Sequence, residues 1–288
     1  MKKILVTGAH GQLGSAIRKI SDEKSGLDFI FTDSDVLDLT NETAIASFFA
    51  NNDFQYVINC AAYTAVDKAE GEIRLCTKIN RDAVGLLSKA CAGKGVKLIH
   101  ISTDYVFDGK NYKPYTEDDA TLPQSVYGQT KLDGENLALQ NNRDTVIIRT
   151  SWLYSEFGNN FVKTMIRLGK EREWLNVVSD QIGTPTYASD LAEAILAIVL
   201  SVDFTPGVYH FSNEGACSWY DFTKVIHRMT NIHCDVHPID STDYPTPAKR
   251  PYYSVLNKKK IKETYGLHIP YWEDSLAKCI EIIENKNI

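Results

Sequence analysis

The sequence lacks two features that would point to a membrane or a nucleic acid. It has no run of about 18 apolar residues, the length that a membrane-spanning helix needs. Its 31 lysine and arginine residues are outnumbered by 37 aspartate and glutamate residues, so the formal net charge is −6. A broad electrostatic surface for nucleic acid usually requires a basic excess. We therefore expect neither partner, and any anionic ligand has to be held by specific local donors.

The sequence also lacks paired cysteines. Six cysteines are scattered along 288 residues and none forms a C-x-x-C pair. This pattern is typical of free thiols in a reducing compartment rather than of a disulfide framework, and it predicts a cytoplasmic protein. One spacing hints at a metal site, His233, Cys234 and His237, but residues that alternate in a strand-like segment rarely close a ligand shell. No metal site is therefore predicted.

What the sequence does contain is a regular alternation of strand-like and helix-like segments. The spacing of apolar residues predicts strands at 3–7, 27–32, 56–60, 96–101 and 145–148, and helices at 11–20, 73–92 and 126–139. Strands that alternate with helices are typical of a parallel sheet covered by helices on both faces. We therefore expect an α/β fold with a doubly wound parallel sheet of the Rossmann type.

The first strand is followed by a glycine-rich turn. Gly8, Gly11 and Gly14 have the spacing G-x-x-G-x-x-G and enclose Gln12 and Leu13. Glycines between a strand and a helix allow the backbone to approach a pyrophosphate, whose charge lies at the N-terminus of the helix. The turn therefore predicts a dinucleotide cofactor.

The end of the second predicted strand carries an acid. Asp33 lies where a carboxylate accepts hydrogen bonds from the adenosine ribose of a dinucleotide. An acid here favours NADH over NADPH because it would repel a 2′-phosphate, whereas Arg18 could offset that repulsion. The choice between NADPH and NADH therefore stays open.

The first 150 residues thus predict a dinucleotide-binding domain. After about residue 150 the alternation loosens, and four prolines occur between residues 238 and 253. Loop-rich segments beside a rigid sheet often shape a substrate pocket. We expect a dinucleotide-binding domain at 1–150, with return segments from about 174–200, and a smaller region at 151–288 that mainly binds substrate.

A second motif is the pair Tyr127 and Lys131. Residues at i and i+4 project from the same face of a helix. An ammonium beside a phenol lowers the pKa of the phenol, so Tyr127 is predicted to pass a proton to a carbonyl oxygen as hydride arrives at carbon. The hydroxyl of Thr103, at the end of the fourth predicted strand, can hydrogen-bond the same oxygen.

These motifs together resemble the extended short-chain dehydrogenase/reductases, which act largely on nucleotide sugars. A closer resemblance covers nearly the whole chain. Segments 59–70, 102–109, 149–154, 158–161, 180–186 and 245–251 are similar, in this order, to segments of the dTDP-4-dehydrorhamnose reductases. Several such segments in the right order are far more specific than any one of them.

The resemblance assigns roles to individual residues. It implies a catalytic set of Thr103, Tyr127 and Lys131. The cofactor site that it implies comprises Gly8, Gly11, Gln12, Leu13, Gly14, Asp33, Asp38, Leu39, Ala61, Ala62 and Tyr63 together with Tyr127 and Lys131. The substrate site that it implies comprises Thr103, Asp104, Tyr105, Trp152, Asn160 and Arg250. A guanidinium such as that of Arg250 suits a diphosphate, which it can bind through two hydrogen bonds.

The residue after Asp104 favours one reaction within this superfamily. Sugar-nucleotide dehydratases resemble T-D-E at this strand end, whereas this chain has Tyr105 in the third position. The resemblance therefore implies reduction of dTDP-4-dehydro-L-rhamnose to dTDP-L-rhamnose by NADPH or NADH, with a homodimer as an optional assembly. Two alternatives stay open: a reductase of another 4-keto-6-deoxy sugar nucleotide, and a non-catalytic dinucleotide-binding regulatory subunit.

Overall fold

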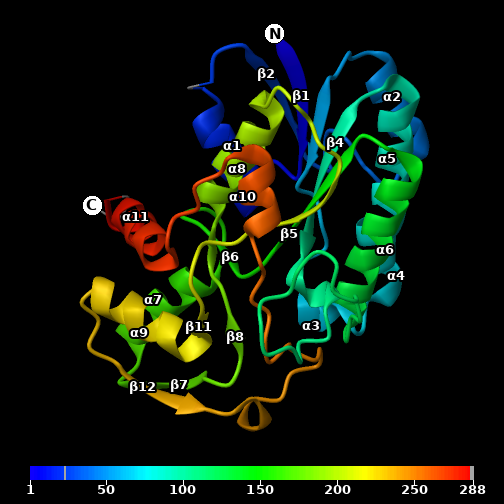
Figure 1. Cartoon of the computed structure of the whole chain (residues 1–288). Coiled ribbons are helices and arrows are strands. Elements are labelled where there is room, and N and C mark those ends of the chain that lie inside the picture. Colours follow the sequence, from blue (N-terminus) through cyan, green and yellow to red (C-terminus); the bar gives the residue numbers. More distant parts are fainter. Residues whose placement is uncertain (23, 286–288) are drawn as a thin grey trace.

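The structure is a computed structural model that describes residues 1–22 and 24–285. Its centre is a six-stranded parallel sheet in the order β10-β5-β4-β3-β1-β2 (Figure 1). The strands are β1 (Lys2–Thr7), β2 (Leu27–Thr32), β3 (Tyr56–Asn59), β4 (Lys97–Thr103), β5 (Thr145–Thr150) and β10 (Gly207–His210). The order reverses between β1 and β3, which is the point where ligands bind in open α/β sheets. The doubly wound fold is therefore confirmed.

Helices cover both faces of this sheet (Figure 1). One face carries α1 (Gln12–Ser21) and α8 (Ala188–Leu200), with α10 (Lys259–Tyr265) nearby, and the other carries α2 (Glu42–Ala50), α5 (Ala83–Lys94) and α6 (Val126–Asn141). Alternate residues of β1 point to opposite faces. Ile4 and Val6 pack with α1 and α8, whereas Leu5 packs with α2 and α5. Both faces are buried, so the strands read as nearly continuous apolar runs.

One predicted helix is interrupted. The sequence pattern predicts a single helix over 73–92, but the structure has α4 (Ile73–Thr77), a turn of π-helix at Lys78–Asp82, and then α5. The extra residue turns the side chain of Asn80 into the protein interior. Its amide accepts a hydrogen bond from the Tyr63 N–H at 2.8 Å and donates to the Tyr63 carbonyl at 3.1 Å. These two bonds to the backbone account for the irregular turn, which apolar spacing cannot predict.

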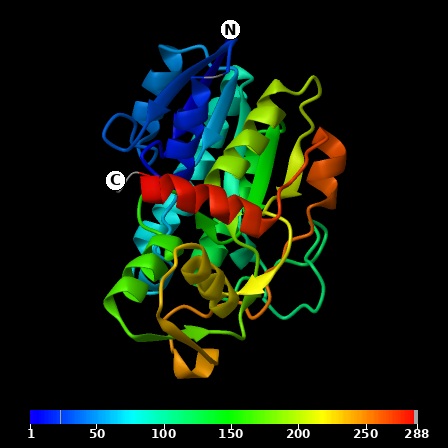
Figure 2. The same ribbon diagram turned by 90° about the vertical axis from the view of Figure 1, so that its left-hand side faces the viewer.

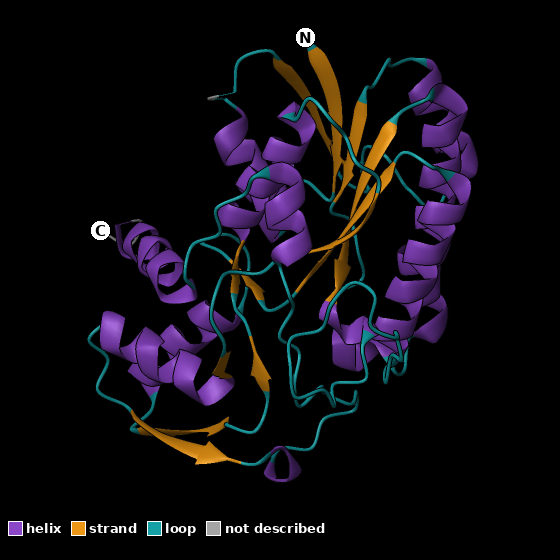
Figure 3. Cartoon of the chain, viewed as in Figure 1, coloured by secondary structure: helices purple, strands orange, loops and turns teal. Residues whose placement is uncertain are grey.

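The remaining elements form a smaller layer at the carboxyl end of the sheet (Figures 1 and 3). Its helices are α7 (Phe161–Glu171), α9 (Trp219–Met229) and α11 (Trp272–Asn285), and α3 (Val66–Ala69) follows β3. Three short strand pairs complete it: β7 (Trp174–Val178) with β12 (Asp235–Ile239), β8 (Ile182–Gly183) with β11 (Cys217–Ser218), and β6 (Leu153–Tyr154) with β9 (Thr186–Tyr187). Single turns of 3₁₀-helix occur at Asp104–Val106 and Ser241–Asp243.

The sequence predicts that segments from about 174–200 return to the first domain, and in the structure only some of them pack there. Helix α8 packs against α1, and β10 extends the main sheet beside β5. Strand β7, at Trp174–Val178, does not return to the sheet, because it pairs with β12 at the far end of the molecule (Figure 2). The six cysteines are free thiols. Within the described ranges, no helix combines the length and apolar character that a membrane span requires.

Candidate active site

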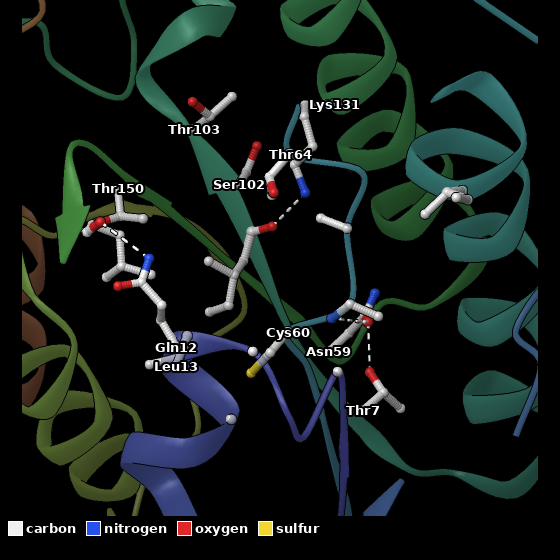
Figure 4. Close-up of a pocket in the computed structure, with 18 of the residues that line it drawn as sticks. Thr7, Gln12, Leu13, Asn59, Cys60, Thr64, Ser102, Thr103, Lys131 and Thr150 are labelled. Atoms are coloured by element: carbon white, nitrogen blue, oxygen red, sulfur yellow. Dashed lines mark hydrogen bonds between the residues drawn. The ribbon is translucent and has the colours of Figure 1, made fainter. Parts of the chain in front are cut away.

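A cavity of about 880 Å³ opens at the carboxyl ends of the central strands. The last residues of β1, β2, β3, β4 and β5 all line it. It brings together most of the predicted cofactor residues, namely Gly8, Gly11, Gln12, Leu13, Gly14, Asp33, Asp38, Leu39, Ala61, Ala62, Tyr127 and Lys131. Figure 4 shows Gln12 and Leu13 of α1 across this space from Thr103 and Lys131. Tyr63 is not among the residues that line it.

The glycine-rich turn leaves no room for side chains. Gly8 has φ +65°, and a Cβ there would lie 2.7 Å from the backbone nitrogen of Ala61. A Cβ on Gly14 would lie 2.4 Å from the carbonyl oxygen of Gly8. Gly11 is the N-cap of α1, and it and Gln12, the first helical residue, both line the cavity. This arrangement fits the pyrophosphate of a dinucleotide, because the N-terminus of α1 lies at the cavity, which its first residues Gln12 and Leu13 line.

Two predicted acids that line the cavity, Asp33 and Asp38, differ in their partners. Asp33 accepts a hydrogen bond of 2.6 Å from the backbone N–H of His10, whose Nδ1 lies 3.1 Å away. Asp38 accepts from both the hydroxyl and the backbone N–H of Thr40, and these bonds lower the pKa of its carboxyl. Leu39, which lies between Asp38 and Thr40 in the sequence, is buried. Asp33 keeps a position from which it can accept ribose hydroxyls.

Tyr127 and Lys131 lie one turn apart on α6. The helix begins after Ser125, whose side chain accepts a hydrogen bond from the Gly128 N–H at 3.1 Å. Gly128 allows α6 to approach the end of β4, because a Cβ there would lie 2.2 Å from the carbonyl oxygen of Tyr105. Lys131 is buried, and its Nζ donates to the carbonyl oxygen of Ile101 at 2.6 Å (Figure 4). Helix α6, which carries Tyr127 and Lys131, is thus attached directly to β4, which ends at Thr103.

The protonation of this pair differs from the sequence-based prediction. Burial lowers the pKa of Lys131 to about 8, although Glu135 acts in the opposite direction. The pKa of Tyr127 is raised rather than lowered, mainly by burial, while a hydrogen bond with Thr103 opposes the rise. Lys131 is not among the largest influences on the pKa of Tyr127. Desolvation of the phenol therefore outweighs the attraction of the ammonium, and Tyr127 carries its proton at neutral pH.

Thr103 lies between Tyr127 and an unusual acid. Its hydroxyl donates to Oδ1 of Asp104 at 2.9 Å and accepts from the backbone N–H of Tyr105 at 3.2 Å. Asp104 is buried, and desolvation raises the pKa of its carboxyl to about 6. Thr103, Asp104 and Tyr105 all line the cavity. The predicted hydroxyl is therefore present, with its hydrogen directed to the neighbouring carboxylate.

The opposite wall of the cavity is aromatic. Trp152 has the unusual φ of 47° and stacks on Trp219, with ring centroids 3.5 Å apart and an angle of 10° between the ring planes. Phe161, which also lines the cavity, lies 4.5 Å from the ring of Trp219. Asn160 lines the cavity too, and its amide donates to Oε1 of Gln12 at 2.9 Å. Trp219 and Phe161 are residues that the sequence analysis missed, because a tertiary stack has no signature in local spacing.

Arg250 lies just outside the cavity. It does not line the space itself, but its Nη1 donates to the hydroxyl of Tyr105 at 2.9 Å and its Nη2 contacts the carboxylate of Asp67 at 2.5 Å. Tyr105 lines the cavity, so the guanidinium is one residue removed from it. Arg250 is thus connected to the site, and Asp67 is a partner that the sequence did not predict.

The chain has the defining features of one class of enzyme. An open parallel sheet, a glycine-rich turn after β1, and a Tyr-x-x-x-Lys pair beside a threonine at the end of β4 are the features of an extended short-chain dehydrogenase/reductase. Residues 1–285 match the family described as the RmlD substrate binding domain. The chain belongs to this family.

Its relatives are similar over their full length. A dTDP-4-dehydrorhamnose reductase from Sinorhizobium fredii is 40% identical, with 96% of each chain covered. The crystal structure of a dTDP-4-dehydrorhamnose reductase from Clostridium acetobutylicum is 45% identical with a TM-score of 0.94, covering 98% of this chain and 99% of that one. A Bacillus anthracis dTDP-4-dehydrorhamnose reductase, solved in complex with NADP, is 39% identical with a TM-score of 0.93 at the same coverage.

Proposed function

We propose that this chain reduces the 4-keto group of dTDP-4-dehydro-L-rhamnose to give dTDP-L-rhamnose. The names of its full-length relatives support this substrate. The observation that carries the proposal is that one cavity joins the glycine-rich turn to Thr103, Tyr127 and Lys131. NADPH or NADH, when bound, supplies the hydride. The turn around Gly8 fits its pyrophosphate, because Gly8 and Gly14 pack on backbone too closely for a side chain and the N-terminus of α1 lines the cavity beside them.

Each catalytic residue has a distinct part in this proposal. Tyr127, which holds its proton at neutral pH, donates that proton to the sugar oxygen at C4. Lys131, held by the carbonyl of Ile101, binds the cofactor ribose and stabilises the phenolate that forms. Thr103 orients the sugar carbonyl beside Tyr127 once its hydroxyl hydrogen turns from Asp104 to the carbonyl oxygen. Proton transfer by a positioned side chain typically contributes about 10²–10⁴ in rate.

The other wall of the cavity binds the nucleotide sugar in this proposal. Asp104 and Tyr105 contact it at the end of β4, and Trp152 and Asn160 contact it from the aromatic side. Arg250 reaches a diphosphate oxygen only if it shares or releases Asp67. We also propose a division near residue 150 between a cofactor-binding region and a substrate-binding region, with α8 and β10 returning to the first.

Two further proposals concern the cell and the assembly. The six free thiols support a cytoplasmic location. A homodimer is supported by exposed apolar side chains on α4, since Ile73 is 53% and Leu75 is 47% exposed. Sedimentation of the wild type at micromolar concentration tests whether the chain forms a dimer. If the wild type is dimeric, we expect Leu75→Lys to be monomeric, and a dimeric Leu75→Lys variant excludes this face as the interface.

The function is tested by consumption of NADPH and of NADH with a panel of 4-keto-6-deoxy sugar nucleotides. We expect turnover with the dTDP-linked 4-keto-rhamnose precursor, and a loss of about 10²–10⁴ in kcat for Tyr127→Phe. Tyr220→Phe, a half-buried tyrosine outside the cavity lining, is the matched control. Turnover of a different keto sugar nucleotide would show that the enzyme has another substrate. Binding of the dinucleotide without turnover of any sugar nucleotide in the panel would favour a regulatory subunit.

A further inference from the structure

A row of buried polar residues crosses the sheet at the edge of the cavity. Thr7 on β1, Asn59 on β3 and His100 on β4 are register partners in neighbouring strands. The Thr7 hydroxyl donates to Oδ1 of Asn59 at 2.7 Å (Figure 4), and Nδ2 of Asn59 lies 3.0 Å from Nδ1 of His100. Nε2 of His100 lies 3.4 Å from Nζ of Lys131. The row therefore ends at the catalytic lysine.

The direction of each hydrogen bond in this row is fixed by one backbone group. The N–H of Ala61, which is a donor only, lies 3.2 Å from Oδ1 of Asn59. The amide of Asn59 is therefore oriented with its oxygen toward Ala61 and its nitrogen toward His100. Because Nδ2 is a donor, Nδ1 of His100 accepts, and the hydrogen of the neutral ring lies on Nε2. That hydrogen points at Lys131.

His100 stays neutral in this position. Its side chain is fully buried, and burial, together with the charge of Lys131, holds the pKa of the ring well below its usual value. The ring therefore presents an N–H dipole to Lys131, not a positive charge. A protonated Lys131 would face this N–H with another donor, whereas a neutral amine accepts a hydrogen bond from it.

The other groups that face Lys131 act in the opposite direction. Glu135 on α6, Cys76 on α4 and Cys60 after β3 all favour the charged lysine. The effect of Glu135 is shared, because its carboxylate also pairs with the buried guanidinium of Arg149 at 2.7 Å. Two influences therefore favour the neutral amine of Lys131: its desolvation by burial and the hydrogen bond from His100 on β4.

We propose that His100 is a positioning residue, whose Nε2–H, directed by Asn59, aligns the Lys131 amine with the Ile101 carbonyl and favours its uncharged form. The effect on catalysis rests on the proposed function. The enzyme then requires protonated Lys131 for the cofactor ribose and the phenolate, so kcat/KM falls above the pKa of Lys131. His100 places that fall closer to neutral pH than an apolar residue would.

The direct test does not depend on activity. The lysine side chains of the cofactor-free protein, labelled with ¹³C, are titrated by NMR, and the signal absent from Lys131→Met is assigned to Lys131. We expect His100→Leu to raise the pKa of Lys131 by about one unit. His100→Gln can accept from Asn59 and donate to Lys131, so we expect it to keep the wild-type value.

A matched control is available in the same sheet. His210 is equally buried, and its Nδ1 contacts the carbonyl of Tyr115 rather than Lys131. His210→Leu is therefore expected to leave the pKa of Lys131 unchanged. A pKa that stays the same in His100→Leu, or rises equally in His210→Leu, overturns the proposal.

A second measurement needs no destabilising variant. The ¹⁵N shifts of the wild-type His100 ring, assigned by their loss in His100→Gln, distinguish the two neutral tautomers. We expect hydrogen on Nε2, and hydrogen on Nδ1 overturns the proposal even where His100→Leu does not fold. Full turnover by Tyr127→Phe would show that the proposed reaction mechanism is wrong. The role of His100 would still be decided by the NMR titration, which does not depend on turnover. In the active enzyme, we expect the alkaline limb of kcat/KM to move with the titration.

Discussion

The two walls of the cavity are built in different ways. On the wall that we propose for the cofactor (the cofactor wall), parallel strands and backbone-to-backbone contacts hold the site, as at Gly8 and Gly14. On the wall that we propose for the nucleotide sugar (the substrate wall), two-residue strands and loops leave the geometry to side chains, above all the stack of Trp152 on Trp219 and, just outside the cavity, the pair of Arg250 with Asp67. A backbone contact has almost no tolerance for added atoms, whereas a stack can be replaced by another apolar surface. The comparison therefore predicts loss of function on one wall and graded loss of affinity on the other.

The strongest test of this difference between the walls is to add a methyl group to the cofactor wall. Gly14→Ala places a Cβ 2.4 Å from the oxygen of Gly8 and 2.6 Å from Cα of Ala9. Because both neighbours are backbone, we expect cofactor affinity to fall at least about tenfold and stability to fall by about 1–3 kcal/mol. Fluorescence titration with NADPH and chemical denaturation measure the two effects.

The matched control for this variant lies on α5. A Cβ on Gly93 meets nothing within 4 Å. Since alanine favours a helix by about 0.8–1 kcal/mol over glycine, Gly93→Ala is expected to be as stable as the wild type or slightly more so. If Gly14→Ala binds NADPH like Gly93→Ala, the cofactor wall is more tolerant than its contacts indicate.

On the substrate wall, Trp219→Leu is expected to have a smaller and more selective effect. It removes the ring on which Trp152 stacks at 3.5 Å, and aromatic pairs of this kind contribute about 0.5–1.5 kcal/mol beyond their burial. KM for the nucleotide sugar should therefore rise about two- to tenfold, with NADPH affinity unchanged. Trp174→Leu, at a 57% exposed tryptophan on β7, is the control and should alter neither constant. A larger change in NADPH affinity than in KM would contradict the separation of the two walls.

The same difference explains what the sequence could predict. Strands, the glycine-rich turn and the Tyr127/Lys131 pair depend on local spacing, and the strand expected at 27–32 matches β2. The sequence shows that His100 is a polar residue within an apolar strand. Its contact with Asn59 and Lys131 could not be predicted, because it depends on the register of three neighbouring strands. The π-turn at Asn80 and the pairing of β7 with β12 depend on contacts distant in sequence. Spacing therefore predicts the cofactor wall better than the substrate wall.

Arg250 tests whether the substrate wall tolerates a conservative change. Arg250→Lys keeps the charge but loses the planar fork that contacts both Tyr105 and Asp67. We expect KM for the nucleotide sugar to rise about two- to fivefold, a scale set by exposed charged pairs, with kcat unchanged. Arg228→Lys, which alters an exposed pair with Glu273 away from the cavity, serves as control. A fall in kcat without a change in KM would place Arg250 in the chemical step instead.

The last expected difference is one of stability at Asp104, and its pH dependence distinguishes Asp104 from Asp38. Burial raises the pKa of Asp104 to about 6, so between about pH 4 and pH 6 the folded state holds a proton that the unfolded state has lost. The stability that Asp104 contributes therefore falls as pH rises through this window. Asp104→Asn removes the effect, and its amide oxygen can still accept from the Thr103 hydroxyl.

Denaturation of Asp104→Asn at several pH values tests this sign directly. We expect the variant to gain stability relative to the wild type between pH 4.5 and pH 7, while kcat at pH 7.5 stays within about a factor of ten, less than the loss of a proton donor. Asp38→Asn is the control, because hydrogen bonds from Thr40 lower the pKa of Asp38. Its carboxyl is ionised in both folded and unfolded states across this range, so its stability difference should stay constant. A constant difference for Asp104→Asn as well would show that its carboxyl titrates like that of an exposed acid, which the buried end of β4 does not favour.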